Sequence, residues 1–232
     1  MEAIQAGKEI DKVLIQKGLT GNLIKDLVKM LADYKIPFQQ VPVEKLNRIV
    51  RGNHQGVVAY LSRIVYSSID NILTTSFWAG RDPMVIILDR ITDVRNFGAI
   101  ARTAEGLGFD ALIIPYNGSA QINEDAMKTS AGALNHLPIC REQNLNLTLK
   151  FLKESGLQVV ACTEKAEKNI YELELTGPIA LLFGSEENGI SPSLIRHSDY
   201  LAKIPMKGKV ASFNVSVTVG IIASEVVRQR RN

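Results

Sequence analysis

The sequence predicts an α/β protein with two domains, a small N-terminal α/β domain and a larger domain built on a parallel sheet. Segments typical of strands and helices alternate along the chain. The run Met84–Asp89 is continuously apolar, as is usual for a strand inside a parallel sheet. Hydrophobic residues make up 46% of the 232 residues and charged residues 22%, so the chain can bury a sizeable core and is not disordered.

The first 66 residues contain a short module of alternating strands and helices. A helix is indicated over Asn22–Tyr34, where apolar residues recur at helical spacing among lysines and aspartates, and it must end before Pro37. The other predicted elements are a strand around Val13–Ile15, a strand over Phe38–Val43, a short helix over Val43–Val50 and a strand over Gly56–Leu61.

The composition changes over residues 67–83, which are rich in Ser, Asp, Asn, Thr, Gly and Pro. Such a composition is typical of a linker, although Ile69, Ile72 and Leu73 could form one or two helical turns. We therefore predict an N-terminal domain over residues 1–66, a linker over 67–83 and a second domain over 84–232.

Three predicted strands of the second domain each lead into a loop that is rich in polar or small residues. They end near Thr163, Phe183 and Ile204. If these strands are parallel, their loops meet at one edge of the sheet, which is where α/β proteins bind small molecules. Further strands are expected at Met84–Asp89 and Ala111–Ile114, and a helix over about Leu145–Glu154.

Several common classes of site are not indicated. The chain has no run of 18 or more apolar residues, and its three histidines lack metal-ligand spacing, so we expect neither a membrane span nor a metal site. Cys140 and Cys162 are far apart and form no CxxC pair, which favours buried free thiols in a reducing cytoplasm. The GxGxxA pattern at Gly106–Ala111 follows a helix and precedes a strand, so it does not predict dinucleotide binding.

Positive charge is concentrated in the first domain. Residues 1–66 hold ten Lys/Arg and six Asp/Glu, a net charge of +4, which leaves seventeen against eighteen, or −1, for residues 67–232. A basic first domain beside a near-neutral second domain suggests a polyanionic partner such as a nucleic acid. A solvent-exposed face with excess lysine would have the same composition.

The C-terminal quarter contains a loop that leads into a helix. Pro205 and Gly208 break regular structure, and either Ser212 or Asn214 could cap the helix that follows. The helix is indicated by the helical spacing of four apolar residues, and its arginine-rich end suits the negative pole of a helix dipole. The apolar residues are Val215, Val219, Ile222 and Val226.

Three loops together resemble a known family. Phe183–Ile190 reads Phe-Gly-Ser-Glu-Glu-Asn-Gly-Ile, and Ile204–Ser216 reads Ile-Pro-Met-x-Gly-x-Val-x-Ser-x-Asn-Val-Ser. Asn96–Ala104 matches Asn-x-Gly-x-x-x-Arg-Thr-Ala. These segments resemble the three motifs of the SpoU (TrmH) class of RNA ribose 2′-O-methyltransferases. Common versions of the first motif differ at Val94 and Arg95, where proline and histidine are frequent.

The resemblance implies a fold, a cofactor and partners. It implies a deep trefoil knot of the SPOUT type in the C-terminal domain and an N-terminal domain similar to ribosomal protein L30e. It also implies S-adenosylmethionine as methyl donor, no metal, an RNA substrate and a homodimer whose partner completes the active site. The segment Arg51–Ala59 resembles the end of the family's substrate-binding domain, where His54 and Gln55 could contact RNA or simply hold a turn.

The resemblance also assigns residues, by position in these motifs. Gly184, Ile204, Met206 and Phe213 would bind the cofactor, although Met206 and Phe213 could instead be core residues. Arg102 would be the catalytic arginine. The residues expected to orient Arg102 and the ribose are Asn96, Glu186, Ser212 and Asn214.

Two of these residues raise physical questions. A guanidinium stays protonated at ordinary pH, so we expect Arg102 to stabilise a developing alkoxide as a fixed charge rather than to act as a general base. On a helix that begins near Gly98, Arg102 would lie over the first turn, near the loop that carries Asn96. For Glu186 an ion pair with an arginine of the site is one expectation, and a purely structural salt bridge is the other.

The proposed substrate within this class is a guanosine ribose of 23S ribosomal RNA, because the small N-terminal domain and the Ser130–Leu134 segment resemble those enzymes. Transfer RNA is the first alternative. A non-catalytic RNA-binding or assembly factor on the same scaffold is the second, and a small-molecule enzyme is the third. Without a leader or membrane span in the sequence, we expect a cytoplasmic protein.

Overall fold

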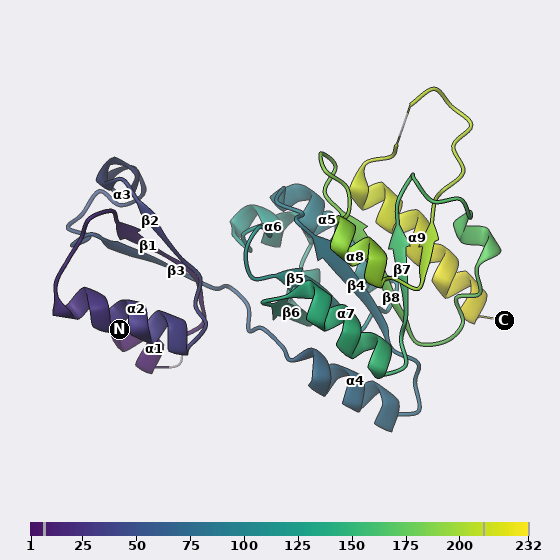
Figure 1. The fold of residues 1–232 in the computed structure, drawn as a ribbon, viewed down its shortest axis with the longest axis horizontal. Helices are drawn as coiled ribbons and strands as arrows, with labels where there is room; N and C mark the ends of the chain where they lie inside the picture. Colours follow the sequence, from purple (N-terminus) through teal and green to yellow (C-terminus); the bar gives the residue numbers. More distant parts are fainter. Residues whose placement is uncertain (7, 211, 232) are drawn as a thin grey trace. The chain divides into compact units, whose positions relative to one another are not determined.

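The computed structural model describes residues 1–6, 8–210 and 212–231, and the chain divides into two compact units, Met1–Val65 and Tyr66–Asn232. The first unit is a three-stranded sheet in the order β2-β1-β3, in which β1 pairs with β2 in parallel and with β3 antiparallel (Figure 1). Its elements are α1 (Glu2–Gln5), β1 (Ile10–Gln16), α2 (Asn22–Asp33), β2 (Phe38–Val41), α3 (Val43–Ile49) and β3 (Val57–Leu61).

Both faces of this small sheet are covered. Ile10, Val13 and Ile15 of β1 pack against Leu27 and Leu31 of α2. On the other face, Leu14 packs with Val41 and with Leu46 of α3. The alternation of side chains along β1 sends them to opposite faces, which explains why the apolar run Val13–Ile15 is buried throughout.

The second unit is a six-stranded, wholly parallel sheet in the order β6-β5-β4-β8-β7-β9. Its strands are β4 (Met84–Asp89), β5 (Ala111–Pro115), β6 (Ile139–Glu142), β7 (Gln158–Cys162), β8 (Ile179–Gly184) and β9 (Tyr200–Ala202). Its helices are α4 (Ile69–Trp78), α5 (Val94–Gly106), α6 (Glu124–Thr129), α7 (Leu145–Glu154), α8 (Pro192–His197) and α9 (Val215–Arg230), with short 3₁₀ turns at Ala133–Asn135 and Ile170–Glu172. The α/β fold class is confirmed, whereas the trefoil knot stays a prediction.

Helices cover both faces of the parallel sheet. Val85 and Ile87 of β4 belong to a buried cluster with α4, α7 and α8. Ile86 and Leu88, which alternate with them, are equally buried and must point to the opposite face. On that side α5 and α9 pack together, and α9 also contacts β8. This double coverage is the physical reason for the unbroken apolar sequence of β4.

Residues 67–83, for which the sequence allowed a linker or one or two helical turns, contain the helix α4. Ile69 and Leu73 are buried in the core of the second unit, and Ser76 is buried where its hydroxyl donates to Asp110 Oδ1 at 3.0 Å. The composition resembles that of a linker because most of the polar side chains of this short helix are exposed. The pair Ile69 and Leu73, four residues apart, was the signal for that helix.

The C-terminal helix follows the predicted pattern. Asn214 rather than Ser212 is its N-cap, and the Asn214 side chain accepts from the backbone N–H of Ser216 at 2.9 Å. All four residues of the predicted apolar stripe are buried. Near the other end, Arg230 donates to the backbone carbonyls of Asp82, Leu175 and Gly177, so the helix is fixed at its basic end as well.

Both cysteines are buried free thiols, as predicted. Removal from water disfavours the thiolate, which raises the pKa of Cys140 to about 12, and the nearby carboxylate of Glu142 adds to the effect. Burial likewise raises the pKa of Cys162. Within the described part of the chain, no helix combines the length and hydropathy required to cross a bilayer.

The packing of α5 on α6 generates a stability prediction at Gly98. A Cβ at this position would lie 2.8 Å from the carbonyl oxygen of Ala126 and 2.8 Å from Thr129 Cβ. We expect Gly98→Ala to lower the free energy of unfolding in urea by ~1–2 kcal/mol, because overpacking outweighs the usual helical gain. Gly106→Ala is the matched control on the same helix, since no atom lies within 4 Å of its added Cβ. Equal stability of the two variants would contradict the prediction.

Candidate functional site

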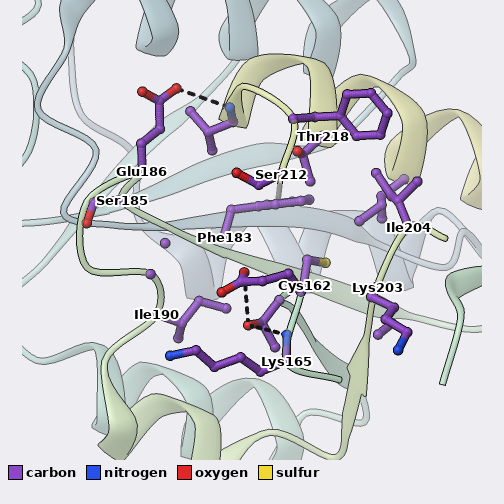
Figure 2. Close-up of a pocket in the computed structure, with 18 of the residues that line it drawn as sticks. Cys162, Lys165, Phe183, Ser185, Glu186, Ile190, Lys203, Ile204, Ser212 and Thr218 are labelled. Atoms are coloured by element: carbon purple, nitrogen blue, oxygen red, sulfur yellow. Dashed lines mark hydrogen bonds between the residues drawn. The ribbon is translucent and has the colours of Figure 1, made fainter. Parts of the chain in front are cut away.

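A pocket of about 250 Å³ lies at the carboxyl ends of β7, β8 and β9. These three strands are neighbours in the sheet, so the loops after Cys162, Gly184 and Ala202 meet at one edge, as predicted. The first turns of α9 close the pocket through Val215, Thr218 and Ile222. Figure 2 shows Ser185 and Glu186 on one side of the pocket, Lys203 and Ile204 on the opposite side, and Phe183 between them.

All four residues predicted to bind a cofactor line this pocket. Gly184 lies at the end of β8, Ile204 and Met206 lie in the loop after β9, and Phe213 lies just before α9. Phe213 is 40% exposed, so it is not a core residue of this chain. Met206 is half-buried. Their role in binding stays a prediction.

The loop after β8 folds back on itself at Gly184. A Cβ on Gly184 would lie 2.1 Å from the carbonyl carbon of Gly189 and 2.2 Å from the nitrogen of Ile190, so only glycine fits. The backbone N–H of Gly189 donates to Ser185 O at 2.8 Å and closes the turn. The glycine is therefore required by the chain's own turn.

Asp89 and Arg90, at the end of β4, fix the far side of the same loop. Asp89 is opposite Gly184 in the strand register and is only 4% exposed. Its Oδ2 accepts from the backbone N–H and hydroxyl of Ser191 at 2.7 and 2.6 Å. Arg90 donates to both Asp89 oxygens and, through Nη2, to the carbonyl oxygen of Gly189, each at 3.2 Å.

Sequence reasoning did not single out this pair. Asp89 was visible as an acidic residue at the end of an apolar strand, where a carboxylate is expected to have a specific partner. Arg90 has φ of 61°, a left-handed conformation that is unfavourable for arginine. Such strain persists only where the surroundings enforce it, and here the two hydrogen-bonded neighbours do so.

Glu186 joins the pocket wall to two helices. Its Oε1 accepts from Asn214 Nδ2 at 2.6 Å, from Asn96 Nδ2 at 3.2 Å and from the backbone N–H of Val215 at 3.3 Å. Asn214 Nδ2 also donates to Asn96 Oδ1 at 3.0 Å. Three of the predicted orienting residues thus form one cluster. Its carboxylate lies at the N-terminus of α9, where the helix dipole favours negative charge.

The arginine partner expected for Glu186 is not found among the described residues. Glu186 is instead hydrogen-bonded by two amides and a backbone N–H, and neither form of salt bridge that we considered is formed. Ser212 lines the pocket, but no hydrogen bond connects it to the cluster. The arrangement provides a preorganised carboxylate at the mouth of a partly apolar cavity.

Arg102 is placed differently from the expectation. Asp93 caps α5 by accepting from the N–H groups of Arg95 and Asn96 at 2.8 Å, so the helix begins at Val94 rather than near Gly98. Asn96 therefore lies in the first turn, and Arg102 lies roughly 9 Å further along the axis and about a third of a turn around it. Arg102 is exposed, is not among the residues that line the pocket, and pairs with no described residue.

The histidine of the first unit holds a turn. His54 Nδ1 accepts from the backbone N–H of Gly56 at 3.0 Å, which leaves Nε2 to donate to Asn47 Oδ1 at 2.8 Å. Both ring nitrogens are thus engaged within the chain. Gln55 is exposed and has φ of 48°, so it is the residue that this turn presents to solvent.

The second unit has the architecture of α/β proteins that bind a small molecule at the carboxyl edge of a parallel sheet. Comparison with known proteins defines it further. Residues 83–224 match the SpoU rRNA Methylase family, and residues 1–66 match the family described as RNA 2′-O ribose methyltransferase substrate binding. The chain belongs to the SpoU rRNA methylase family, and is thus an RNA methyltransferase of the SpoU/TrmH class.

Individual relatives agree with this family. The chain is 36% identical over 231 residues to a Staphylococcus aureus protein named as a TrmH family tRNA/rRNA methyltransferase, covering 100% of this chain and 93% of that one. It is 32% identical over 230 residues to YacO of Bacillus subtilis, with the same type of name, covering 99% and 92%. The fold resembles the SpoU methyltransferase AviRb of Streptomyces viridochromogenes in complex with AdoMet, with a TM-score of 0.65, 24% identity and coverage of 99% and 86%.

The Asp89 contacts predict that this residue controls the order of the pocket wall. Asp89→Asn keeps one acceptor oxygen but turns an amide N–H₂ towards donors on Ser191 or Arg90. Loss of charge-assisted bonds is expected to cost ~1.5–3 kcal/mol locally, so the amides of Gly189 and Ser191 should exchange with deuterium about 10- to 100-fold faster. Asp26→Asn, at an exposed position of α2, is the control. Unchanged exchange in Asp89→Asn would refute the assignment.

Proposed function

We propose that this chain is a cytoplasmic enzyme that methylates the ribose 2′-hydroxyl of a guanosine in 23S ribosomal RNA. The enzyme is an S-adenosylmethionine-dependent RNA methyltransferase of the SpoU class. The choice of ribosomal RNA, guanosine and the 2′-hydroxyl is the proposal. The pocket supports methyl transfer, and the first unit supports an RNA substrate.

The observation that carries the proposal is the double role of Glu186. Its side chain lines the pocket and at the same time accepts hydrogen bonds from Asn96 and Asn214. The three residues come from three motifs that are separated by 28 and 90 positions in the sequence. A cofactor in the pocket would therefore be held in a fixed position relative to the first turns of α5 and α9.

The lining of the pocket suits S-adenosylmethionine in charge and polarity. The charged residues of the lining are Glu164, Glu186, Glu187, Lys165 and Lys203, which gives a formal charge of −1. The methyl donor carries a sulfonium, an ammonium and a carboxylate, a formal charge of +1. Apolar side chains of the lining could enclose the adenine, as is usual in small-molecule sites. These side chains are Phe183, Ile190, Ile204, Met206 and Phe213.

The chemistry needs a nucleophilic ribose oxygen aligned with the methyl group. Bound S-adenosylmethionine supplies an electrophilic methyl carbon on a positively charged sulfur. We assign to Arg102 the fixed positive charge that lowers the pKa of the 2′-hydroxyl and stabilises the developing alkoxide, while a phosphate of the RNA takes the proton. Asn96, Glu186, Ser212 and Asn214 would orient the ribose and Arg102 around this reaction.

A homodimer with shared active sites reconciles the position of Arg102 with this role. Arg102 does not line the pocket of its own chain, and its side chain is exposed and unpaired in the described structure. We assign it to the pocket of a second copy, so that each site combines the cofactor pocket of one protomer with the arginine of the other.

The first unit is assigned to RNA binding. It carries a net charge of +4 over residues 1–66 and matches a substrate-binding family over the same range. Transfer RNA is the alternative substrate, since the names of the relatives cover both tRNA and rRNA. The specific support for ribosomal RNA is the presence of this separate, small basic domain.

The substrate is tested by mapping 2′-O-methyl groups in RNA from cells with and without this protein. We expect one guanosine of 23S ribosomal RNA to lose its methyl group when the protein is absent, and purified protein with labelled S-adenosylmethionine to restore it. Total tRNA serves as the competing substrate in the same assay. Restoration of a tRNA site alone would replace the proposed substrate.

Shared active sites predict complementation between two inactive variants. Arg102→Ala should reduce methyl transfer by at least about 10³-fold, while S-adenosylmethionine affinity measured by calorimetry stays within a few-fold. Gly184→Ala should lose cofactor binding, because its Cβ collides with the backbone of Gly189 and Ile190. Co-expressed and purified together, the two variants should recover activity, because a mixed dimer contains one site that is intact.

Each variant co-expressed with itself is the control for this experiment. Activity that is not recovered in verified mixed dimers would place Arg102 and Gly184 in the same protomer's site. Full activity of Arg102→Ala alone would remove the arginine from the mechanism altogether.

A further inference from the structure

One exposed face of α5 carries two arginines that have no partner among the residues described. Arg95 and Arg102 are seven residues apart, so they lie roughly 10 Å apart along the axis and within about 20° around it. Both are exposed, and neither guanidinium pairs with a described residue. By contrast, Arg81, Arg90 and Arg228 each form an ion pair with an aspartate or glutamate.

The position of Arg95 is unfavourable for the helix itself. It is the second residue of α5, at the positive pole of the helix dipole, where a cation is disfavoured. Asp93 offsets part of this effect, but its Oδ1 is occupied by the backbone N–H groups of Arg95 and Asn96. The stability of the helix therefore does not explain an arginine at this position. Binding of a negatively charged ligand would explain it.

Arg95 is also next to a residue of the Glu186 cluster. The next residue, Asn96, donates to Glu186 of the pocket wall, so the N-terminal turn of α5 is part of the site already described. About 100° of helix rotation separates neighbouring side chains, which leaves Arg95 beside the cluster rather than within it. The pair Arg95 and Arg102 thus forms a positively charged line that starts at the cluster and runs along α5.

We propose that Arg95 binds a phosphate of the substrate RNA next to the target nucleotide and thereby holds the RNA at the site. This assignment rests on the proposed function and deepens it. A guanidinium is suited to the task because its planar fork can donate two parallel hydrogen bonds to phosphate oxygens. The contact reads the backbone and not the base, so it contributes affinity and register without sequence specificity.

The test compares Arg95→Ala and Arg95→Lys with the wild-type protein. For Arg95→Ala we expect the KM for transcribed 23S ribosomal RNA to rise about 5- to 10-fold, and the slope of log affinity against log salt to fall by about 1. The kcat at saturating RNA should change less than about two-fold, and S-adenosylmethionine affinity should not change. Arg95→Lys should keep the salt slope, because the charge remains, and recover part of the affinity.

Lys150→Ala is the matched control, because it removes one exposed positive charge from α7, on the other face of the sheet. It should leave RNA affinity and salt slope unchanged. The melting temperature gives a separate readout, because removing a cation from the start of α5 should leave it unchanged or raise it. A lowered melting temperature in Arg95→Ala would show a structural role and overturn the proposal.

RNA binding by filter assay, without turnover, separates this proposal from the proposed function. Wild-type affinity and salt slope in Arg95→Ala would overturn the phosphate contact even if methyl transfer to 23S ribosomal RNA is confirmed. Conversely, a wild-type protein that binds this RNA but transfers no methyl group to it would contradict the proposed function. Loss of affinity in Arg95→Ala would then still support the phosphate contact.

Discussion

The structure of the site depends on one carboxylate oxygen, Glu186 Oε1, which accepts from Asn96, Asn214 and the N–H of Val215. These donors come from the first turn of α5 and the start of α9, and Glu186 itself lies on the pocket loop. A single charged acceptor thus holds three segments together. Charged acceptors form stronger hydrogen bonds than neutral ones, and the N-terminus of α9 adds a favourable dipole, so this point is well suited to a fixed geometry.

The opposite end of the same loop has its own anchor. Asp89 binds Ser191, and Arg90 binds Gly189. Because Gly184 has no side chain, the backbone of Gly189 and Ile190 can pack directly against it. With both ends attached to the sheet and helices, the loop forms the wall of a pocket whose shape is set before a ligand enters. Preorganisation of this kind reduces the entropy lost on binding.

The position of the arginines follows from the start of α5. Because Asp93 caps the helix, the helix begins four residues earlier than Gly98, and Arg102 is carried away from the pocket of its own chain. The same shift puts Arg95 at the helix N-terminus. One capping aspartate therefore decides both that Arg102 lies outside the lining of its own chain's pocket and that Arg95 stands in the first turn of α5.

The sequence by itself determined the α/β class, the buried faces of β4 and α9, and the sheet edge where three loops meet, because hydrophobic periodicity and strand ends are local signals. It also determined the family, since the three motifs are contiguous segments. Only the tertiary structure decided between a linker and a helix at residues 67–83, that Glu186 binds amides instead of an arginine, and that Asp89 and Arg90 hold the pocket wall. Those features depend on burial against another element or on contacts between residues 28 to 102 positions apart, such as Glu186 with Asn214 and Asp89 with Ser191. No local pattern in the sequence encodes which residue will be the partner.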